Sequence, residues 1–184
     1  LSMSFKQGVN HVDNFQRDMA GFQDMSFRYA KAWNNKFAFK SNVSYFKGLD
    51  WYATNYTDVD PNTPAAARGS ANPGKNSLNI YGDEVAQNIN GIGRVSRTGY
   101  EERDLTDYQV DNLKLNTALH YRIANNLEAI YQYNFGKGTA NYTGSSRFSI
   151  NNFTLQQHRL ELKGSQFFIR GYTTIENSHD SYNS

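Results

Sequence analysis

Four things are missing or scarce in this chain of 184 residues, and each absence excludes a class of protein. There is no cysteine, which excludes disulfides, thiolate metal sites and cysteine nucleophiles. Only 3 prolines and 14 glycines are present, so the chain is neither collagen-like nor a flexible linker. The formal net charge is only +2, so charge gives no sign of a nucleic-acid partner.

The fourth absence is that of long hydrophobic runs. Hydrophobic residues make up 38% of the chain and the mean hydropathy is −0.75, so we expect no membrane-spanning helix. A membrane-spanning β-strand remains compatible with these values, because it needs an apolar side chain only at every second position. Aromatic residues are abundant, with 13 Tyr, 12 Phe and 2 Trp. This enrichment is typical of strands and of the interfacial girdles of outer-membrane barrels.

Three tight polar turns each separate two runs of alternating apolar and polar residues: Asn34-Asn35, Asn125-Asn126 and Gly164-Ser165. This pattern is typical of antiparallel hairpins. It predicts three of them, over about residues 24–48, 110–136 and 150–177.

The connections between these hairpins are much longer than the turns within them. The first, a long loop over about residues 49–109, has roughly 60 residues, and the second, over 137–149, has roughly 14. Short turns at one rim and long loops at the other favour a transmembrane barrel over a soluble sandwich. The strand runs of about ten residues also match the 9–11 that a tilted strand needs to cross a bilayer.

The second hairpin has the clearest alternation. One side of its first strand carries Leu113, Leu115, Thr117, Leu119, Tyr121 and Ile123, and polar residues such as Lys114 and Asn116 fall between them. In a soluble domain the polar side would meet water, and in a wide barrel it would line a hydrated lumen or contact a plug. The third hairpin alternates less regularly, and this predicts a β-bulge near Gln156-Gln157.

These patterns predict an all-β fold: a segment of an antiparallel transmembrane β-barrel with long extracellular loops. Six or seven recognisable strands are too few for a wide channel, and bacterial barrels have even strand numbers from 8 upward. The chain also ends in a polar run that is typical of the start of another loop. We therefore expect residues 1–184 to be a partial domain of a larger barrel.

The long loop contains the best candidates for ligand contact, because such loops meet solutes and partner proteins. An aromatic and acidic cluster suits stacking on a sugar ring or binding a cation: Trp51, Tyr52, Tyr56, Asp58 and Asp60. The alternative is an interfacial aromatic girdle followed by a solvated turn. A calcium loop beginning at Asp58 would require Gly and Glu where Thr63 and Gly69 stand, so no metal site is expected.

Two other stretches of the loop also carry expectations. A short helix is expected from Ser77 to about Ile89, with Ser77 as its N-cap. The acidic residues Glu101, Glu102 and Asp104, with Arg103 among them, are interpreted as a charged loop surface. Because no nucleophile–base pair or metal constellation stands out, we expect neither an enzyme nor a cofactor.

Several stretches resemble the barrel domain of TonB-dependent outer-membrane receptors of the Bacteroidetes, SusC-like type. They are residues 27–51, 80–85, 96–105, 119–123, 162–170 and 172–178. The likeness extends over whole hairpins and loops, from about residue 24 to the end.

The resemblance implies a nominally 22-stranded barrel in the bacterial outer membrane, with an N-terminal plug domain that this chain does not contain. It implies import of glycans, peptides or metal chelates with energy delivered by TonB through the plug. The implied partners are outer-membrane lipid, the TonB complex and, in many such receptors, a surface lipoprotein. Two other functions compatible with the residues are a soluble carbohydrate-binding β-sandwich and a small complete outer-membrane barrel.

Overall fold

The computed structural model describes residues 1–12, 18–59, 73–143 and 147–183. The chain divides into two units. The sheet unit comprises Leu1–Val12, Met19–Asp50 and Gln109–Ser184, and the loop unit comprises Asp13–Asp18 and Trp51–Tyr108. Long strands make up most of the sheet unit, and the described ranges contain one 3₁₀ turn, η1 (Glu102–Asp104), and no α-helix. Within these ranges no helix is long and apolar enough to cross a membrane.

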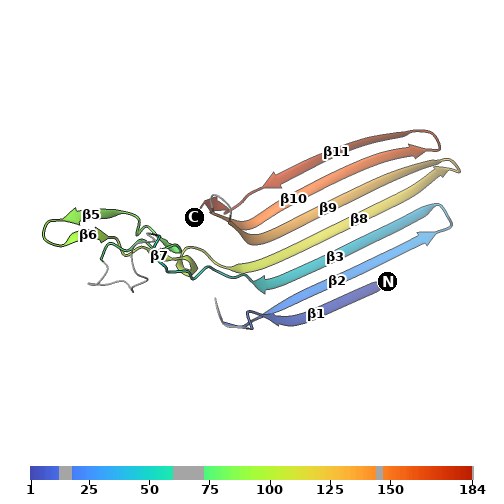
Figure 1. Ribbon diagram of the computed structural model, residues 1–184. Helices are drawn as coiled ribbons and strands as arrows, with labels where there is room; N and C mark the ends of the chain where they lie inside the picture. Colours follow the sequence, from blue (N-terminus) through green and yellow to red (C-terminus); the bar gives the residue numbers. More distant parts are fainter. Residues whose placement is uncertain (13–17, 60–72, 144–146, 184) are drawn as a thin grey trace. The chain divides into compact units, whose positions relative to one another are not determined.

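The sheet unit is one antiparallel meander of long strands. The strands follow the order β1-β2-β3-β8-β9-β10-β11, and every neighbouring pair is antiparallel, as Figure 1 shows. The two-residue β12 pairs with β10 beyond the end of β11. The all-β, antiparallel part of the predicted fold is therefore confirmed, and in the described residues this sheet is open, with β1 and β11 at its edges. The strands are β1 (Ser2–Asn10), β2 (Ala20–Trp33), β3 (Phe37–Leu49), β8 (Gln109–Ala124), β9 (Leu127–Thr143), β10 (Arg147–Gly164), β11 (Phe168–Asn177) and β12 (Tyr182–Asn183).

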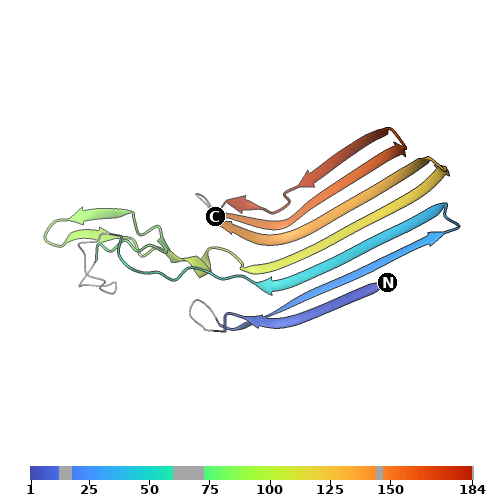
Figure 2. The ribbon, with the colours of Figure 1, turned by 45° about the vertical axis from the view of Figure 1, so that its right-hand side comes forward.

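The short turns lie together at one end of this sheet, as Figures 1 and 2 show. Between β2 and β3, Asn34 and Asn35 both have positive φ, 47° and 51°, and the amide of Lys36 donates to the carbonyl of Trp33 at 2.9 Å. Two consecutive left-handed residues make a turn whose twist matches that of the flanking strands, and asparagine tolerates this conformation. The polar Asn-Asn pair in the sequence thus has a direct structural reason.

The strands are longer than the sequence pattern indicates. β9 has 17 residues and β10 has 18, so most of the connection expected over 137–149 is strand, and that expectation is wrong. The expected bulge is also misplaced. The register shifts between Ile150 and Phe153, where Asn152 has a φ of 54°, whereas Gln156 and Gln157 pair regularly with β9.

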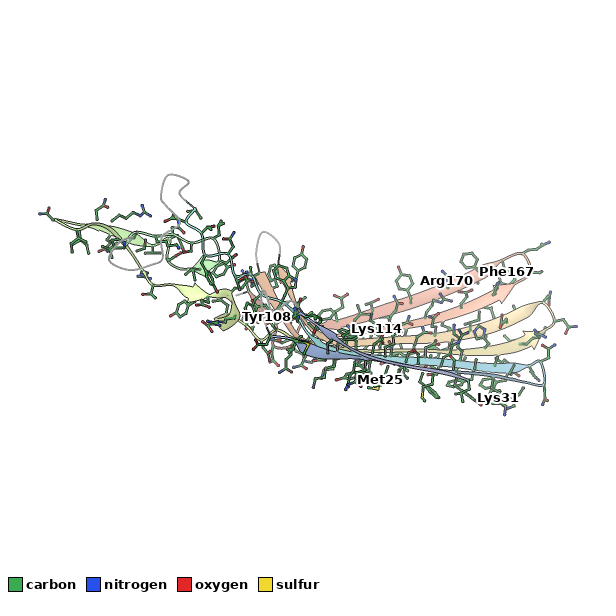
Figure 3. The ribbon with its side chains drawn as sticks, turned by 60° about the horizontal axis from the view of Figure 1, so that its bottom comes forward. Met25, Lys31, Tyr108, Lys114, Phe167 and Arg170 are labelled. Atoms are coloured by element: carbon green, nitrogen blue, oxygen red, sulfur yellow. The ribbon has the colours of Figure 1, made fainter. Side chains whose placement is uncertain are left out.

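The register divides the side chains of the sheet into two faces. Directly paired residues share a face, so a row can be followed across the strands. The apolar face contains a row of Met3, Phe27, Val43, Leu115 and Phe135. The polar face contains the adjacent row of Ser2, Arg28, Asn42, Asn116, Asn134 and Gln157. In Figure 3, Met25 and Lys31 lie on one side of the sheet, and Lys114 and Arg170 on the other.

Four side-chain amides form a hydrogen-bonded ladder across the polar face. Asn42 Nδ2 donates to Asn116 Oδ1 at 3.2 Å, Asn116 Nδ2 donates to Asn134 Oδ1, and Asn134 Nδ2 donates to Gln157 Oε1 at 3.1 Å. We call Asn42, Asn116, Asn134 and Gln157 the amide ladder. It links β3, β8, β9 and β10 on the polar face.

The apolar face is not covered by protein in the described residues. Phe27 is 43% exposed, Leu160 64% and Ile169 67%, although all three are large apolar side chains. The buried hydrophobic residues of the sheet unit are small or few: Ala20, Ala118 and Ile130. A single sheet of this size cannot bury its own apolar face, so that face needs an environment other than water.

Candidate ligand-binding site in the long loop

The loop unit is held together by short strand pairs and close backbone contacts. β4 (Ile80–Tyr81) pairs with β7 (Tyr100–Glu101), and β5 (Ala86–Ile89) forms a hairpin with β6 (Gly93–Ser96). Gly91 and Gly93 supply positive φ at the hairpin end, 79° and 100°. These strands replace the helix expected from Ser77 to about Ile89, and that expectation is wrong.

A buried aspartate explains why the helix does not form. Asp83 is fully buried, and its Oδ2 accepts the backbone N–H of Ser77 at 2.9 Å. Ser77 also forms an isolated antiparallel bridge with Asp58. These contacts hold Ser77 in a turn, and Gly82, with a φ of 97°, reverses the chain where a helix would have to continue.

A second buried carboxylate organises the base of the loop. Glu102, in η1 (Glu102–Asp104), is only 5% exposed, and its Oε2 accepts the hydroxyl of Tyr81 at 2.9 Å. The Tyr108 hydroxyl donates to the Glu102 carbonyl oxygen at 3.0 Å. The Tyr108 ring stands edge-on to the ring of Tyr52, with 5.5 Å between their centroids. The loop thus has a small core built from tyrosines around a carboxylate.

A third cluster, at the surface, joins Tyr56, Glu101 and Arg103. Glu101 Oε2 accepts the Tyr56 hydroxyl at 3.0 Å and lies 2.7 Å from Arg103 Nη2. Burial, followed by the hydrogen bond to Glu101, raises the pKa of Tyr56 above its ordinary value. The negative charge of Glu101 raises the pKa of Arg103 as well. Both effects keep the phenol neutral and the guanidinium charged across the physiological range.

These groups border an open cavity of about 440 Å³. Its lining mixes tyrosine rings, hydroxyls and charges: Tyr56, Lys75, Ser77, Ile80, Thr98, Gly99, Tyr100, Glu101 and Asp104. Tyr100 is 67% exposed and Tyr56 37%, so two rings are available for contact. Ring faces beside hydrogen-bonding groups suit a small polar ligand such as a sugar unit, and the volume lies within the usual range for ligand pockets.

The structure describes four of the five residues that the sequence grouped together, and it does not bring these four to one site. Tyr56 borders the cavity, Tyr52 packs against Tyr108, and Asp58 forms the bridge to Ser77. Trp51 is 51% exposed and does not line the cavity. Asp60 lies outside the described residues.

Sequence reasoning missed the roles of Glu101 and Glu102. Interpreted as a charged surface, they instead accept tyrosine hydroxyls, and Glu102 is buried. No local pattern marks these bonds, because Tyr56 is 45 residues from Glu101 and Tyr81 is 21 from Glu102. The described residues contain no group of three or more His, Cys, Asp or Glu side chains placed to hold a metal ion.

Comparisons of the chain with protein-family models, with curated proteins and with solved structures find no match. Proposals about function therefore depend on the sequence pattern, the resemblance of its hairpins and the geometry described above.

Proposed function

We propose that this chain is part of the barrel wall of a TonB-dependent outer-membrane receptor that imports nutrients. One observation carries the membrane part of the proposal. The apolar face is a band that begins within the long strands and reaches their ends at the short turns, and its limited height is what a hydrocarbon layer of fixed thickness requires. The import part is supported by the resemblance of the hairpins and loops to that family.

The band has a measurable height. Along β2 it runs from Met25 to Trp33, eight residue steps, or about 27 Å along the strand at ~3.4 Å per residue. A strand tilted by about 40° would then cross about 21 Å, close to the ~25 Å apolar band of outer-membrane barrels. Trp33, Phe37 and Tyr121 share the last row at the short-turn end, where an interfacial aromatic girdle is expected.

The two faces exchange character at the other end of the band. The next row of the apolar face is entirely polar: Gln7, Gln23, Lys47, Asp111 and Thr139. At this end the polar face gains apolar residues instead: Phe22, Phe46, Val110, Ile150 and Phe153. A sheet that packed on a protein core would have no reason to reverse its sidedness in the middle of its strands. A barrel wall that passes from the bilayer into water would be expected to reverse its sidedness in this way.

Two polar side chains within the band, His158 and Gln156, contact tyrosines, whereas Lys31 lies over the Trp33 ring and Ser41 pairs with Thr117. His158 lies on the apolar face, and its Nδ1 is 2.8 Å from the Tyr131 hydroxyl, while the Tyr133 ring lies 4.8 Å from its ring centre. The Tyr133 hydroxyl donates to Gln156 Oε1 at 3.1 Å. Because an unpaired polar group in hydrocarbon costs several kcal/mol, this pairing favours a lipid environment for the face.

The proposed roles follow from this placement. The apolar face meets lipid, and the polar face borders the solute path and the plug. The long loop, with its cavity at Tyr56 and Glu101, helps to capture the solute. TonB acts through the plug domain of the receptor, and a surface lipoprotein is a further proposed partner. A soluble sandwich is less well supported, since among the described residues the other two sheets have only two strands each.

Fractionation of cells that express the full-length protein tests the membrane location. We expect recovery in the outer-membrane fraction, extraction only with detergent, and cleavage by external protease within residues 51–108. Recovery in the aqueous fraction without detergent would contradict the proposal. Import is tested separately by comparing nutrient uptake in cells with and without TonB, and uptake that does not depend on TonB would exclude this receptor class.

A further inference from the structure

The polar face of the sheet carries an excess of positive charge. By register and strand parity it holds eight basic side chains: Lys6, Arg28, Lys40, Lys114, Arg122, Arg159, Lys163 and Arg170. It holds four acidic ones among the described residues: Asp24, Glu128, Glu161 and Glu176. The question is which of these cations already have a counterion.

Three of the four acidic side chains are engaged by neighbouring bases. Glu161 Oε2 lies 2.7 Å from Arg170 Nε and 3.3 Å from Arg159 Nη2. Glu128 lies 2.9 Å from His120. Asp24 lies 3.8 Å from Lys6. The fourth, Glu176, is on the edge strand β11, three strands away from Lys114 on β8.

Three cations in the middle of the face have no such partner. Arg28 on β2, Lys40 on β3 and Lys114 on β8 form no ion pair with any carboxylate in the described ranges. Their direct cross-strand neighbours are small or uncharged: Ser2 and Asn42 for Arg28, Ala30 and Ala118 for Lys40, and Ser44 and Gly136 for Lys114. We call Arg28, Lys40 and Lys114 the cationic strip.

The amide ladder runs through this strip and adds hydrogen-bond donors. Arg28 pairs directly with Asn42, and Lys40 and Lys114 stand in the rows on either side of the ladder. Each ladder asparagine uses one of its two N–H groups within the ladder, which leaves a second donor. Asn134 Oδ1, by contrast, already accepts from both Asn116 and Gln132. The surface therefore offers more donors than acceptors, together with positive charge.

We propose that the cationic strip and the amide ladder bind an anionic, hydroxyl-rich solute, namely an acidic oligosaccharide. The proposal rests on the proposed function, because it assigns the polar face to the solute path. Carboxylates of such a sugar meet the three cations, and its hydroxyl oxygens accept from the ladder amides. Rings of Lys and Arg select anions in membrane pores, and charge of one sign in a concave site raises the local concentration of the opposite ion.

The experiment measures binding of two tetrasaccharides to the full-length protein in detergent at low salt. Tetragalacturonate carries four carboxylates, and maltotetraose carries none. The test variant combines Arg28→Gln, Lys40→Gln and Lys114→Gln. We expect the unaltered protein to prefer tetragalacturonate, and the variant to bind it at least about tenfold more weakly, with a smaller dependence on salt. Maltotetraose binding should not change.

The matched control removes the same amount of charge from outside the polar face, by Lys36→Gln, Lys47→Gln and Lys137→Gln. Lys36 is in the turn between β2 and β3. Lys47 and Lys137 are on the apolar face, in the two rows at the end of the band that is farther from the short turns. This control should retain the preference for tetragalacturonate. An equal loss in both triple variants would reduce the effect to overall charge and overturn the assignment.

Two other results would also overturn the inference. Absent or unselective tetragalacturonate binding in the unaltered protein overturns the inference. So does a test variant that melts at a lower temperature while binding normally, because the cations would then be paired with a protein domain lodged against the wall. Both results leave the membrane location intact if the protein fractionates with the outer membrane. Recovery as a water-soluble protein would instead refute the proposed function and this inference with it.

Discussion

The sheet unit and the loop unit differ in which side chains they expose and which they bury. The sheet unit leaves Phe27 and Leu160 exposed on one face and carries 13 basic against 7 acidic residues. The loop unit carries 6 basic against 10 acidic residues, and it buries Asp83 and Glu102 in its interior. The loop unit therefore holds its buried carboxylates with donors of its own, the Ser77 amide and the Tyr81 hydroxyl, whereas the sheet unit leaves its apolar face uncovered.

The two units therefore depend on different interactions for their stability. The loop unit needs the hydrogen bond from Tyr81 to the Glu102 carboxylate, because a buried carboxylate without donors is strongly unfavourable. The sheet unit has regular pairing from β1 to β11, but its apolar face gains nothing until water is removed from it. Mutations in the two units should consequently respond to different environments.

The largest effect is expected on the apolar face. Leu115→Arg places a charge in the middle of the proposed band and should make membrane insertion less favourable by about 2–4 kcal/mol. Lys114→Arg, one residue away on the other face, should be nearly neutral. Reversible folding into lipid vesicles, followed by denaturant titration, measures both. Equal and small effects at the two positions would remove the distinction between the faces.

A smaller effect, confined to the loop unit, is expected from Glu102→Ala. The substitution leaves the Tyr81 hydroxyl without its carboxylate acceptor, while Tyr108 keeps the backbone carbonyl, and should destabilise the loop by about 1–3 kcal/mol. Limited proteolysis within residues 73–108 should accelerate, while folding into vesicles should remain normal. Insertion that failed in this variant would show that the two units do not behave independently.

Asn116→Ala should destabilise the sheet unit, by less than the charge at Leu115 does. It removes the hydrogen bonds to Asn42 and Asn134 in the amide ladder, a loss of about 1–2 kcal/mol. Ser26→Ala, in the next row of the same face, is the control and should be close to neutral. Denaturant titration in vesicles compares the two, and indistinguishable midpoints would mean that the ladder contributes nothing to stability.

The smallest effect is expected from Tyr56→Phe, which removes the hydrogen bond to Glu101 at a partly exposed position. We expect a loss of about 0.5–1 kcal/mol from the loop unit at neutral pH. Since folding raises the pKa of Tyr56, its contribution is present below the ordinary tyrosine pKa and disappears as pH rises through the raised value. Loop proteolysis followed across alkaline pH should therefore differ between the two proteins at neutral pH and converge at high pH.

The sheet was more accessible to sequence reasoning than the loop, for a physical reason. Alternation and turn chemistry are local, so Asn34-Asn35 and the run from Leu113 to Ile123 indicate hairpins without any knowledge of partners. The lengths of β9 and β10 were underestimated because the apolar alternation of β9 stops after Phe135 and a bulge interrupts the periodicity of β10. The bulge at Asn152 followed from pairing with β9, which no local pattern records.

The loop depends on contacts between distant residues. Ser77 has the composition of a helix N-cap, yet Asp83 takes its amide and Asp58 pairs with it. Of the candidate residues that the structure describes, Tyr56 borders the cavity, and its partner Glu101 lies 45 residues away. Such pairings are set by tertiary structure, which overrides the local preference.

The central claim is that the apolar face of the sheet touches hydrocarbon. The chain has no cysteine, so single cysteines can be introduced at each position from 109 to 123 and spin-labelled in the membrane-reconstituted protein. Accessibility to oxygen, which concentrates in hydrocarbon, should peak at the odd positions from Leu113 to Tyr121. Accessibility to a water-soluble nickel complex should instead peak at the even positions. The odd-position maxima should vanish at Asp111. Equal accessibility at both parities, or oxygen maxima at Lys114 and Asn116, would contradict the account.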